Sequence, residues 1–331
     1  MFDQSSQLEI PANTRLNNFA LGILFVVLGS SSYGMLSTFV KLSYKQNFTT
    51  AEVTIAQFFW GALVLTIMGF FVDKTAPKVT ATDIRKLMVA GIPVGLTSVF
   101  YYLAVKYIDA SVAVVLLMQS VWMGVVVEAF QTKSFPKLDK IFAVVMILFG
   151  TLLATNVLGS SHGALDIRGV ILGLVSAMSF SWTMFSTSSV ASHLPPVKRS
   201  QFMVYSGGIV VTVFGLLTQV GPHYFELYWV GEEFIRNQPF NPQIFLTYGL
   251  IVAIFGTIIP PIMLNKGFPI VGVGLGSILS SVELPFAVTI AFIFLNEQVI
   301  ATQWLGVAVI ISAIVLLNYK LIAPGNKSGR A

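Results

Sequence analysis

The stretch Ile141–Leu153 has the sequence IFAVVMILFGTLL, an apolar run without a charged residue. A membrane β-strand alternates lipid-facing apolar residues with lumen-facing polar ones over about ten positions. This stretch shows no such alternation. Because lipid offers the backbone no hydrogen-bond partners, only helices and closed barrels cross a bilayer. The stretch therefore predicts a membrane-spanning helix, and the chain contains nine more runs of the same kind.

The composition agrees with a membrane environment. The chain has 331 residues, of which 55% are hydrophobic and 10% charged, and its mean hydropathy is +0.82. Soluble domains carry about 25% charged residues. The absence of cysteine excludes disulfides, thiolate zinc sites, iron–sulfur clusters and a cysteine nucleophile.

We expect an all-α membrane protein of ten transmembrane helices, since about 20 apolar residues cross the hydrocarbon core. The predicted helices are 19–43, 53–72, 85–106, 110–131, 139–158, 168–192, 201–220, 244–265, 270–295 and 299–320. Residues 1–18 and 321–331 are expected to be tails. The aromatic-rich connection 221–243 is interpreted either as a segment in the membrane interface or as a plain extramembrane loop.

The distribution of basic residues predicts the orientation. Of the 19 Lys and Arg residues, fourteen fall on the side of the N-terminus and five on the other side. Cytoplasmic loops carry the excess of positive charge in membrane proteins. Both termini are therefore expected in the cytosol, as an even number of helices requires. We expect a multi-pass protein of a bacterial inner membrane.

The sequence also repeats itself. Residues 21–24 (LGIL) resemble 168–172 (RGVIL) at the openings of two predicted helices, and residues 120–122 (SVW) resemble 281–283 (SVE). The repeats would cover 19–158 and 168–320, with five helices each. An odd number of helices inverts the second copy, and inverted repeats are common in secondary transporters, which bind substrate near the midplane.

Glu283 is the leading candidate for a functional residue. It lies near the centre of the predicted helix 270–295, where a charged side chain costs about 2.5–3.5 kcal/mol on insertion scales. Such a group usually faces a cavity and marks a substrate or proton path. The alternative is a protonated, hydrogen-bonded structural glutamate. Pro285 removes a backbone hydrogen bond nearby and is expected to bend the helix.

Other polar and aromatic residues lie inside predicted helices. Gln119 and Trp122 share one helix face, and Trp122 aligns with Glu283 in the other repeat, so the pair either binds a polar solute or packs. Glu128 lies near a helix end and is expected to act in structure or gating. Some of five deep aromatic residues are expected to line a cavity and the others to pack: Tyr33, Trp60, Tyr101, Tyr102 and Trp182.

Small residues and prolines indicate packing and bending. Gly272, Gly276 and Ser280 recur every four residues, which permits close helix contact. Kinks are expected at Pro93 and at Pro260 with Pro261. The sequence contains no P-loop, HExxH motif or catalytic triad at motif spacing, and its three histidines lie in or beside loops. We therefore expect no cofactor, no metal, no nucleic-acid partner and no enzyme.

These features bear a family resemblance. The run Ser281–Pro285, followed by Leu295–Glu297 and Gln303–Gly306, resembles the EamA type of the drug/metabolite transporter superfamily. Asn296 stands where that family usually has glycine, and Trp122 replaces the glutamate in the first copy. The resemblance covers about residues 19–320. It implies ten helices in two inverted repeats, a central cavity and alternating access.

The resemblance also implies a function. Family members export amino acids, metabolites or drugs, and relatives exchange sugar phosphates or nucleotide sugars. We expect a secondary active exporter of a small metabolite, amino acid or organic cation, with protons as a second partner. A sugar-phosphate antiporter and a membrane-embedded lipid enzyme or scramblase are the alternatives. No Lys or Arg is expected deep in a helix, which argues against a strongly anionic substrate. The sequence leaves the oligomeric state open.

Overall fold

A computed structural model describes residues 12–73, 75–108, 110–154, 166–295 and 299–322. Every regular element in these ranges is a helix, which confirms the predicted all-helical class. The predicted tails, the repeat boundary at 158 and the Leu295–Glu297 motif lie largely outside the described residues. The first helix already begins at Ala12, within the segment predicted as the N-terminal tail.

The first half of the chain holds α1 to α6: α1 Ala12–Lys45, α2 Thr50–Phe70, α3 Ala81–Tyr107, α4 Ala110–Leu117, α5 Ser120–Thr132 and α6 Leu138–Ala154. The second half begins with α7 Ile167–Ser189, α8 Pro196–Gly215, the π-helical turn η1 Leu216–Val220 and α9 Gly221–Phe225. It continues with η2 Glu232–Phe234, α10 Gln243–Leu246, α11 Tyr248–Ala253, the π-helical turn η3 Ile254–Ile258, α12 Ile259–Val271, α13 Val273–Ser280, α14 Glu283–Leu295 and α15 Ala301–Ile322.

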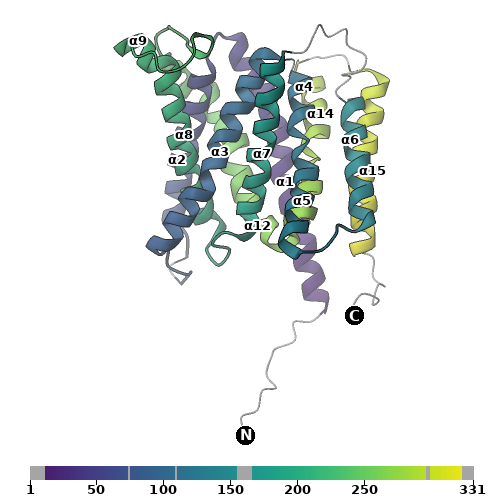
Figure 1. The fold of residues 1–331 in the computed structure, drawn as a ribbon. Coiled ribbons are helices and arrows are strands. Elements are labelled where there is room, and N and C mark those ends of the chain that lie inside the picture. Colours follow the sequence, from purple (N-terminus) through teal and green to yellow (C-terminus); the bar gives the residue numbers. More distant parts are fainter. Residues whose placement is uncertain (1–11, 74, 109, 155–165, 296–298, 323–331) are drawn as a thin grey trace.

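Eight described helical stretches are long and apolar enough to cross a membrane. They are Asn17–Lys45, Thr50–Phe70, Ala81–Tyr107, Ala113–Thr132, Ile167–Ser189, Pro196–Phe225, Tyr248–Val271 and Val273–Phe294. Ala301–Leu317 is a shorter apolar helix. The axes run roughly parallel, and α1 begins on the side of the bundle where α15 ends (Figure 1). The chain is therefore an integral, multi-pass membrane protein.

Local hydrogen bonds set where several helices begin. Thr49 and Glu52 form a capping box at α2, and Thr80 and Asp83 form one at α3. Each box gives partners to backbone N–H groups that the first helical turn leaves free. Asp166 caps α7 without such a box, through one bond from the Arg168 backbone N–H, and its bonds from the Arg168 side chain and backbone hold the pKa of this carboxyl below its usual range.

Two predicted helices differ from the expectation, because each is broken near its middle. The helix predicted at 110–131 divides into α4 and α5 around Met118 and Gln119. The helix predicted at 270–295 divides into α13 and α14 at Ser281 and Val282. A break leaves backbone groups without helical partners, which membrane proteins tolerate only where protein or a cavity surrounds them.

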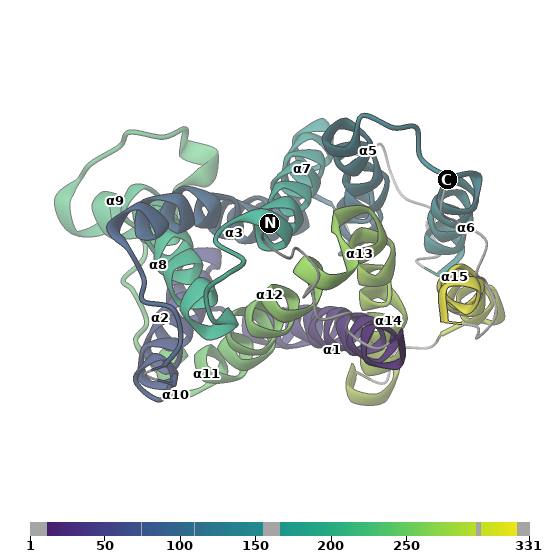
Figure 2. The same cartoon turned by 90° about the horizontal axis from the view of Figure 1, so that it is seen from below.

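The helices pack in a defined set of neighbours. Helix α1 lies against α12 and α14, α3 lies against α7 and α8, and α2 lies against α8. Figure 2 shows α6 and α15 together at one end of the bundle, with α2, α8 and α10 at the other. Glycines allow the close contacts, since a Cβ atom on Gly95 would lie 2.5 Å from the Gly207 carbonyl oxygen.

The segment that follows α9 is tied to α2. The Glu52 side chain is fully buried, and its Oε1 accepts hydrogen bonds from the Asn241 backbone N–H and from Gln219 Nε2, both at 2.8 Å. Gln219 belongs to η1, so one buried carboxylate holds α2, the π-helical turn and this segment together. Phe225 and Trp229 are exposed, and the segment's place in the membrane interface stays a prediction.

Adjacent glycines on α8 provide a test of this packing. A Cβ on Gly207 would lie 2.5 Å from Cε1 of Phe58, a buried ring, whereas a Cβ on Gly208 meets its nearest atom at 3.9 Å. We expect Gly207→Ala to destabilise the protein by about 1–3 kcal/mol through overpacking. Thermal unfolding in detergent measures the effect. Gly208→Ala is the matched control and should melt like the wild type; equal melting of both variants would contradict this packing.

Candidate functional site

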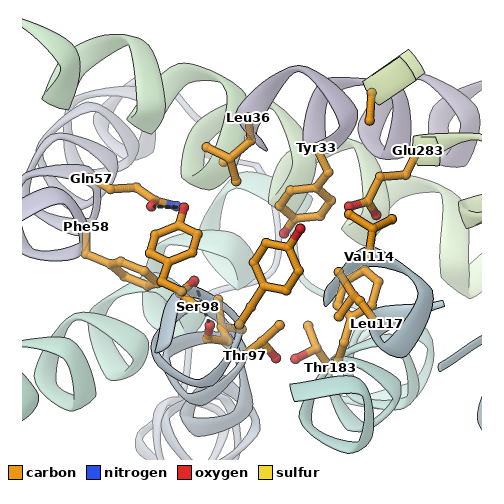
Figure 3. Close-up of a pocket in the computed structure, with 16 residues that line it drawn as sticks. Tyr33, Leu36, Gln57, Phe58, Thr97, Ser98, Val114, Leu117, Thr183 and Glu283 are labelled. Atoms are coloured by element: carbon orange, nitrogen blue, oxygen red, sulfur yellow. Dashed lines mark hydrogen bonds between the residues drawn. The ribbon is translucent and has the colours of Figure 1, made fainter. Parts of the chain in front are cut away.

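A cavity lies in the bundle between α1, α2, α3, α4, α7, α14 and the π-helical turn η3 (Figure 3). Its volume is about 60 Å³. Pockets that hold drug-sized ligands usually measure about 300–1,000 Å³, so a ligand of that size would enter this cavity only if its walls moved apart. The lining residues are Tyr33, Leu36, Gln57, Phe58, Val94, Thr97, Ser98, Tyr101, Tyr102, Val114, Leu117, Phe180, Thr183, Gly256, Glu283 and Ala287.

Glu283 is the acidic residue among these lining residues. It is the first residue of α14, directly after the break, and its carboxylate points toward Tyr33 and Val114 in Figure 3. Its Oε2 is buried without a hydrogen-bond partner in the described part of the chain. Gly34 of α1 lies against this point, since a Cβ there would collide with the Glu283 carbonyl. The close approach of α1 therefore positions the backbone of Glu283 beside the cavity.

Aromatic side chains form much of the wall. The ring of Tyr33 packs edge-on against Phe180 at 5.8 Å between centroids, and Tyr101 lies 6.1 Å from Tyr102. Tyr102 is buried and donates a hydrogen bond of 3.0 Å to Gln57 Oε1. The structure thus brings four of the predicted residues to one cavity: Tyr33, Tyr101, Tyr102 and Glu283.

The other predicted residues lie outside this cavity. Trp122 donates to Gln119 Oε1 at 3.0 Å, and Gln119 donates to the Val115 carbonyl at 3.0 Å, so the pair closes on itself at the α4–α5 break. Trp60 donates to the Phe245 carbonyl at 2.9 Å. Trp182 is 60% exposed on the bundle surface. None of the four is among the residues that line the cavity.

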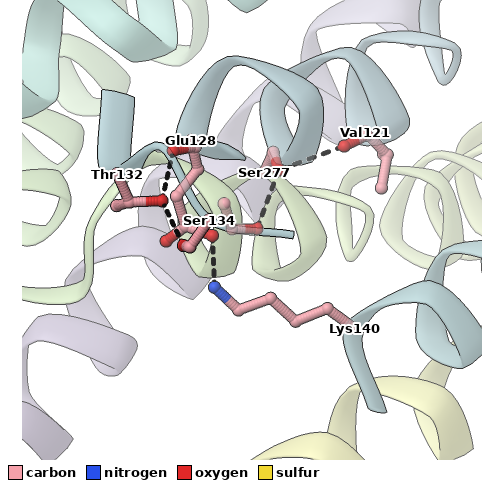
Figure 4. A network of polar contacts seen from close by, with 7 residues as sticks. Val121, Glu128, Thr132, Ser134, Lys140 and Ser277 are labelled. Atoms are coloured by element: carbon pink, nitrogen blue, oxygen red, sulfur yellow. Dashed lines mark hydrogen bonds and ion pairs between the residues drawn. The ribbon is translucent and has the colours of Figure 1, made fainter. Parts of the chain in front are cut away.

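A second polar cluster joins α5, α6 and α13 (Figure 4). Glu128, in the last turns of α5, forms an ion pair with Lys140 of α6. Its carboxylate lies directly against Gly274 in the first turn of α13, where an added Cβ would collide with it. A carboxylate at a helix N-terminus is favourable because free N–H groups and the helix dipole are positive there. Glu128 thus links the ends of three helices.

The two broken helices are also in direct contact within this region. Ser277 of α13 donates to the Val121 carbonyl of α5 at 3.2 Å, and a Cβ on Gly124 would lie 2.5 Å from Ser277 Cβ (Figure 4). The halves α5 and α13 therefore touch through small residues, whereas the halves α4 and α14 contribute lining to the cavity.

The small residues predicted as a helix stripe have separate roles. Gly272 joins α12 to α13 with a φ of 79°, a left-handed conformation that suits glycine. Gly276 lies against the ring of Phe268, since an added Cβ would be 2.5 Å from Cε1. Ser280 donates to the Gly276 carbonyl at 2.9 Å.

The prolines occupy irregular places, as predicted in part. Pro285 lies in the first turn of α14, where its missing N–H has no helical acceptor, so the irregularity is a break rather than a bend. Pro260 and Pro261 open α12 immediately after the π-helical turn η3. Pro93 lies inside α3, and its carbonyl accepts a bond from Thr97 at 2.7 Å.

Arg199 is a buried residue that the sequence pattern did not reveal. Its side chain is 1% exposed in the first turn of α8, and its guanidinium donates to the carbonyls of Thr187, Val190 and Asn265 at 2.6, 3.0 and 2.8 Å. The first two carbonyls belong to the end of α7. The third lacks its usual helical donor because Pro269, four residues later, has no N–H. That proline spacing is the available sequence signal.

The Arg199 contacts generate a stability prediction. We expect Arg199→Met to lower the free energy of unfolding by about 2 kcal/mol, because each buried carbonyl left unpaired costs about 1–3 kcal/mol, partly offset by removal of a buried charge. Arg199→Lys should restore little of this loss, since an ammonium does not reproduce the fork of guanidinium donors. Thermal unfolding measures both. The exposed Arg85→Met is the control, and a wild-type melting curve for Arg199→Met would refute the role.

The described residues contain no group of three or more metal-ligating side chains. A helical membrane bundle with an internal cavity defines a class of solute-binding membrane proteins. The sequence profile described as "EamA-like transporter family" matches residues 20–156 and again residues 167–319. The chain therefore belongs to the EamA-like transporter family, within the drug/metabolite transporter superfamily, as the sequence motifs predicted.

Individual proteins agree with this assignment. "Uncharacterized transporter YcbK" of Bacillus subtilis (strain 168) is 17% identical over 319 residues, which covers 95% of this chain and 98% of that protein. A solved crystal structure, 14% identical over 93% of this chain and 99% of its own, has a TM-score of 0.69 and supports the fold. The family points to a transporter of a small molecule in a lipid bilayer rather than to an enzyme.

Proposed function

We propose that this chain is a secondary active exporter of a small organic cation or zwitterionic metabolite, such as an amino acid, and that it works by alternating access. The single observation that carries the proposal is the Glu283 carboxylate, whose buried Oε2 has no partner among the described residues and lies at a tyrosine-lined cavity. A buried carboxylate without a partner is unfavourable unless it is protonated or meets a cation. A cationic substrate would supply that partner.

The same carboxylate suggests how transport is coupled. A proton and an organic cation would compete for Glu283, because either one neutralises it. Exclusive occupancy by one or the other is the arrangement needed to exchange an outgoing cation for an incoming proton. Among the described residues, the cavity lining contains no Lys or Arg, which disfavours the sugar-phosphate alternative, since phosphate sites use basic residues. The same described lining offers no nucleophile beside a general base, which disfavours the lipid-enzyme alternative.

The packing supports ten helices in two inverted five-helix repeats, at 19–158 and 168–320. The family profile matches the chain twice. The contact of α1 in the first half with α12 in the second corresponds to the contact of α7 in the second half with α3 in the first. The breaks between α4 and α5 and between α13 and α14 fall at corresponding places in the two copies.

The broken helices provide a route for alternating access. The halves α5 and α13 touch each other, and the halves α4 and α14 flank the cavity. Exchanging these roles would close the cavity on one side and open it on the other. In this proposal the termini, and with them the α5–α13 contact, lie in the cytosolic half of a bacterial inner membrane, and the excess of Lys and Arg on the side of the termini supports this orientation. This arrangement would be open to the exterior.

Ligand binding tests the proposed site. A ligand that binds only the folded state increases the free energy of unfolding by mass action, by about 2.7 kcal/mol at a ligand concentration of 100 times its Kd. The melting temperature rises as a result. We expect amines or zwitterions, and not sugar phosphates, to stabilise the purified protein in a thermal-shift screen. Glu283→Gln should abolish the shift, since it removes the carboxylate and keeps the shape.

The exposed Glu232→Gln is the matched control and should keep the full shift. A response limited to phosphorylated compounds, or a shift that survives in Glu283→Gln, would overturn the assignment.

Cysteine labelling tests alternating access, because the chain has no cysteine and single-cysteine variants report without background. Ser98→Cys, in the cavity lining, should react with a membrane-impermeant maleimide from the side opposite the termini. Ser277→Cys, fully buried at the α5–α13 contact, should be protected from both sides. Adding Gly124→Leu to Ser277→Cys should raise labelling from the terminal side several-fold, because the leucine forces the two helices apart. Equal labelling of Ser98→Cys from both sides would indicate a channel-like path instead.

A further inference from the structure

The polar groups that line the cavity divide into satisfied and unsatisfied ones. The hydroxyls of Thr97, Ser98 and Thr183 donate to carbonyls of their own helices, at 2.7, 3.4 and 3.1 Å. Among the described residues, no hydrogen bond involves the Glu283 carboxylate, the hydroxyls of Tyr33 and Tyr101, or Gln57 Nε2. These remaining groups are available to a ligand.

Gln57 is held in one orientation by its surroundings. Its side chain is 1% exposed, and its Oε1 accepts the hydrogen bond from Tyr102. Its backbone carbonyl accepts a bond of 3.0 Å from Thr257 Oγ1 in η3. Gly256 makes room for the amide, since a Cβ there would lie 2.5 Å from Nε2. The amide nitrogen is therefore a positioned donor at the cavity wall.

The two ends of the cavity differ in chemistry. Gln57 and Glu283 lie at opposite ends in Figure 3, with Tyr33 and Leu36 between them. One end offers a carboxylate for a cation, and the other offers an uncharged N–H donor. Aromatic rings line the space between the ends, and such rings favour an apolar or aromatic body and attract ammonium groups.

Resting on the proposed function, the geometry points to Gln57 as a specificity-determining residue that selects elongated amines with a neutral hydrogen-bond acceptor at the far end. A ketone, amide or ether would meet the Gln57 amide while the ammonium meets Glu283. Within the class of substrates proposed above, this arrangement favours organic cations over a simple α-amino acid. Its carboxylate lies beside its ammonium, so it would face Glu283, and no Lys or Arg in the lining would compensate it.

A matched pair of amines tests the selection. The probes are 4-acetylphenethylamine and 4-isopropylphenethylamine, which differ by a carbonyl oxygen in place of a methyl group. We expect the wild-type protein to bind the acetyl compound about tenfold more tightly, as one hydrogen bond allows. Calorimetry of the full chain in detergent measures both dissociation constants.

In Gln57→Leu the preference should disappear, and the affinity for the isopropyl compound should stay within about twofold of wild type. Gln57→Met serves the same purpose should the leucine variant not fold. Tyr102→Phe keeps the Gln57 amide but removes the hydrogen bond that orients it. We therefore expect a smaller preference for the acetyl compound over the isopropyl compound. The exposed Gln243→Leu is the control and should keep the full preference.

The outcomes separate this inference from the proposed function. Equal binding of both amines by the wild type, lost in Glu283→Gln, would overturn the role of Gln57 and leave the cation site standing. A preference that persists in Gln57→Leu, or a preference for amines with a far-end donor, would overturn it as well. Absence of binding by either amine, with stabilisation by phosphorylated compounds only, would refute the cation site itself.

Discussion

The absence of water in the hydrocarbon core is the constraint on which this structure depends, because every backbone polar group there needs a partner within the protein. Most of the chain meets this requirement as continuous helix. The two breaks, after Leu117 and after Ser280, are permitted because both lie inside the bundle. The second break also places Glu283 in the first helical position of α14. Free N–H groups and the helix dipole at that position favour a negative charge. The break between α13 and α14, which requires burial inside the bundle, therefore also provides a favourable position for an acidic side chain.

Close helix contacts follow from this arrangement, since lipid provides no hydrophobic drive for helices to associate. The backbones instead approach through glycine, as at Gly95 with Gly207 and at Gly34 with the Glu283 carbonyl. Buried charges are satisfied by the backbone itself. Arg199 donates to two carbonyls at the end of α7 and to one that a proline has freed, and Glu52 accepts from a backbone N–H and a side-chain amide near the start of α2. Each therefore stabilises a junction between helices.

The sequence pattern predicts the helical class, the positions of most helices, and Glu283 with three of its tyrosine neighbours. The helical class is confirmed, and the structure brings Glu283 and the three tyrosines to one cavity, while their roles in binding stay predictions. Apolar length and an acid in mid-helix can be recognised because they are local signals. The breaks were missed since neither Met118–Gln119 nor Ser281–Val282 contains the glycine or proline that usually marks one. Arg199 lies beside a loop in the sequence, and its burial depends on carbonyls contributed by α7 and α12. The position of Gln57 depends on Gly256 and Tyr102, which are distant in the chain. Gln119 and Trp122 do share a helix face, but their side chains contact each other rather than the cavity.

The contact between α5 and α13 is weak enough to open, as alternating access would require. Small residues join the two helices, with one hydrogen bond from Ser277 to the Val121 carbonyl. That bond contributes about 1 kcal/mol net. The Glu128–Lys140 pair joins α5 to α6 rather than to α13, so it need not break when α5 and α13 separate. Opening thus costs roughly 1 kcal/mol of specific polar interaction, and a ligand shifts a conformational equilibrium only by its differential affinity for the two states, typically about 1–3 kcal/mol. Binding of a cation or a proton at Glu283 would supply such a difference, because a carboxylate that is buried without a partner among the described residues is unfavourable in the state that the structure shows.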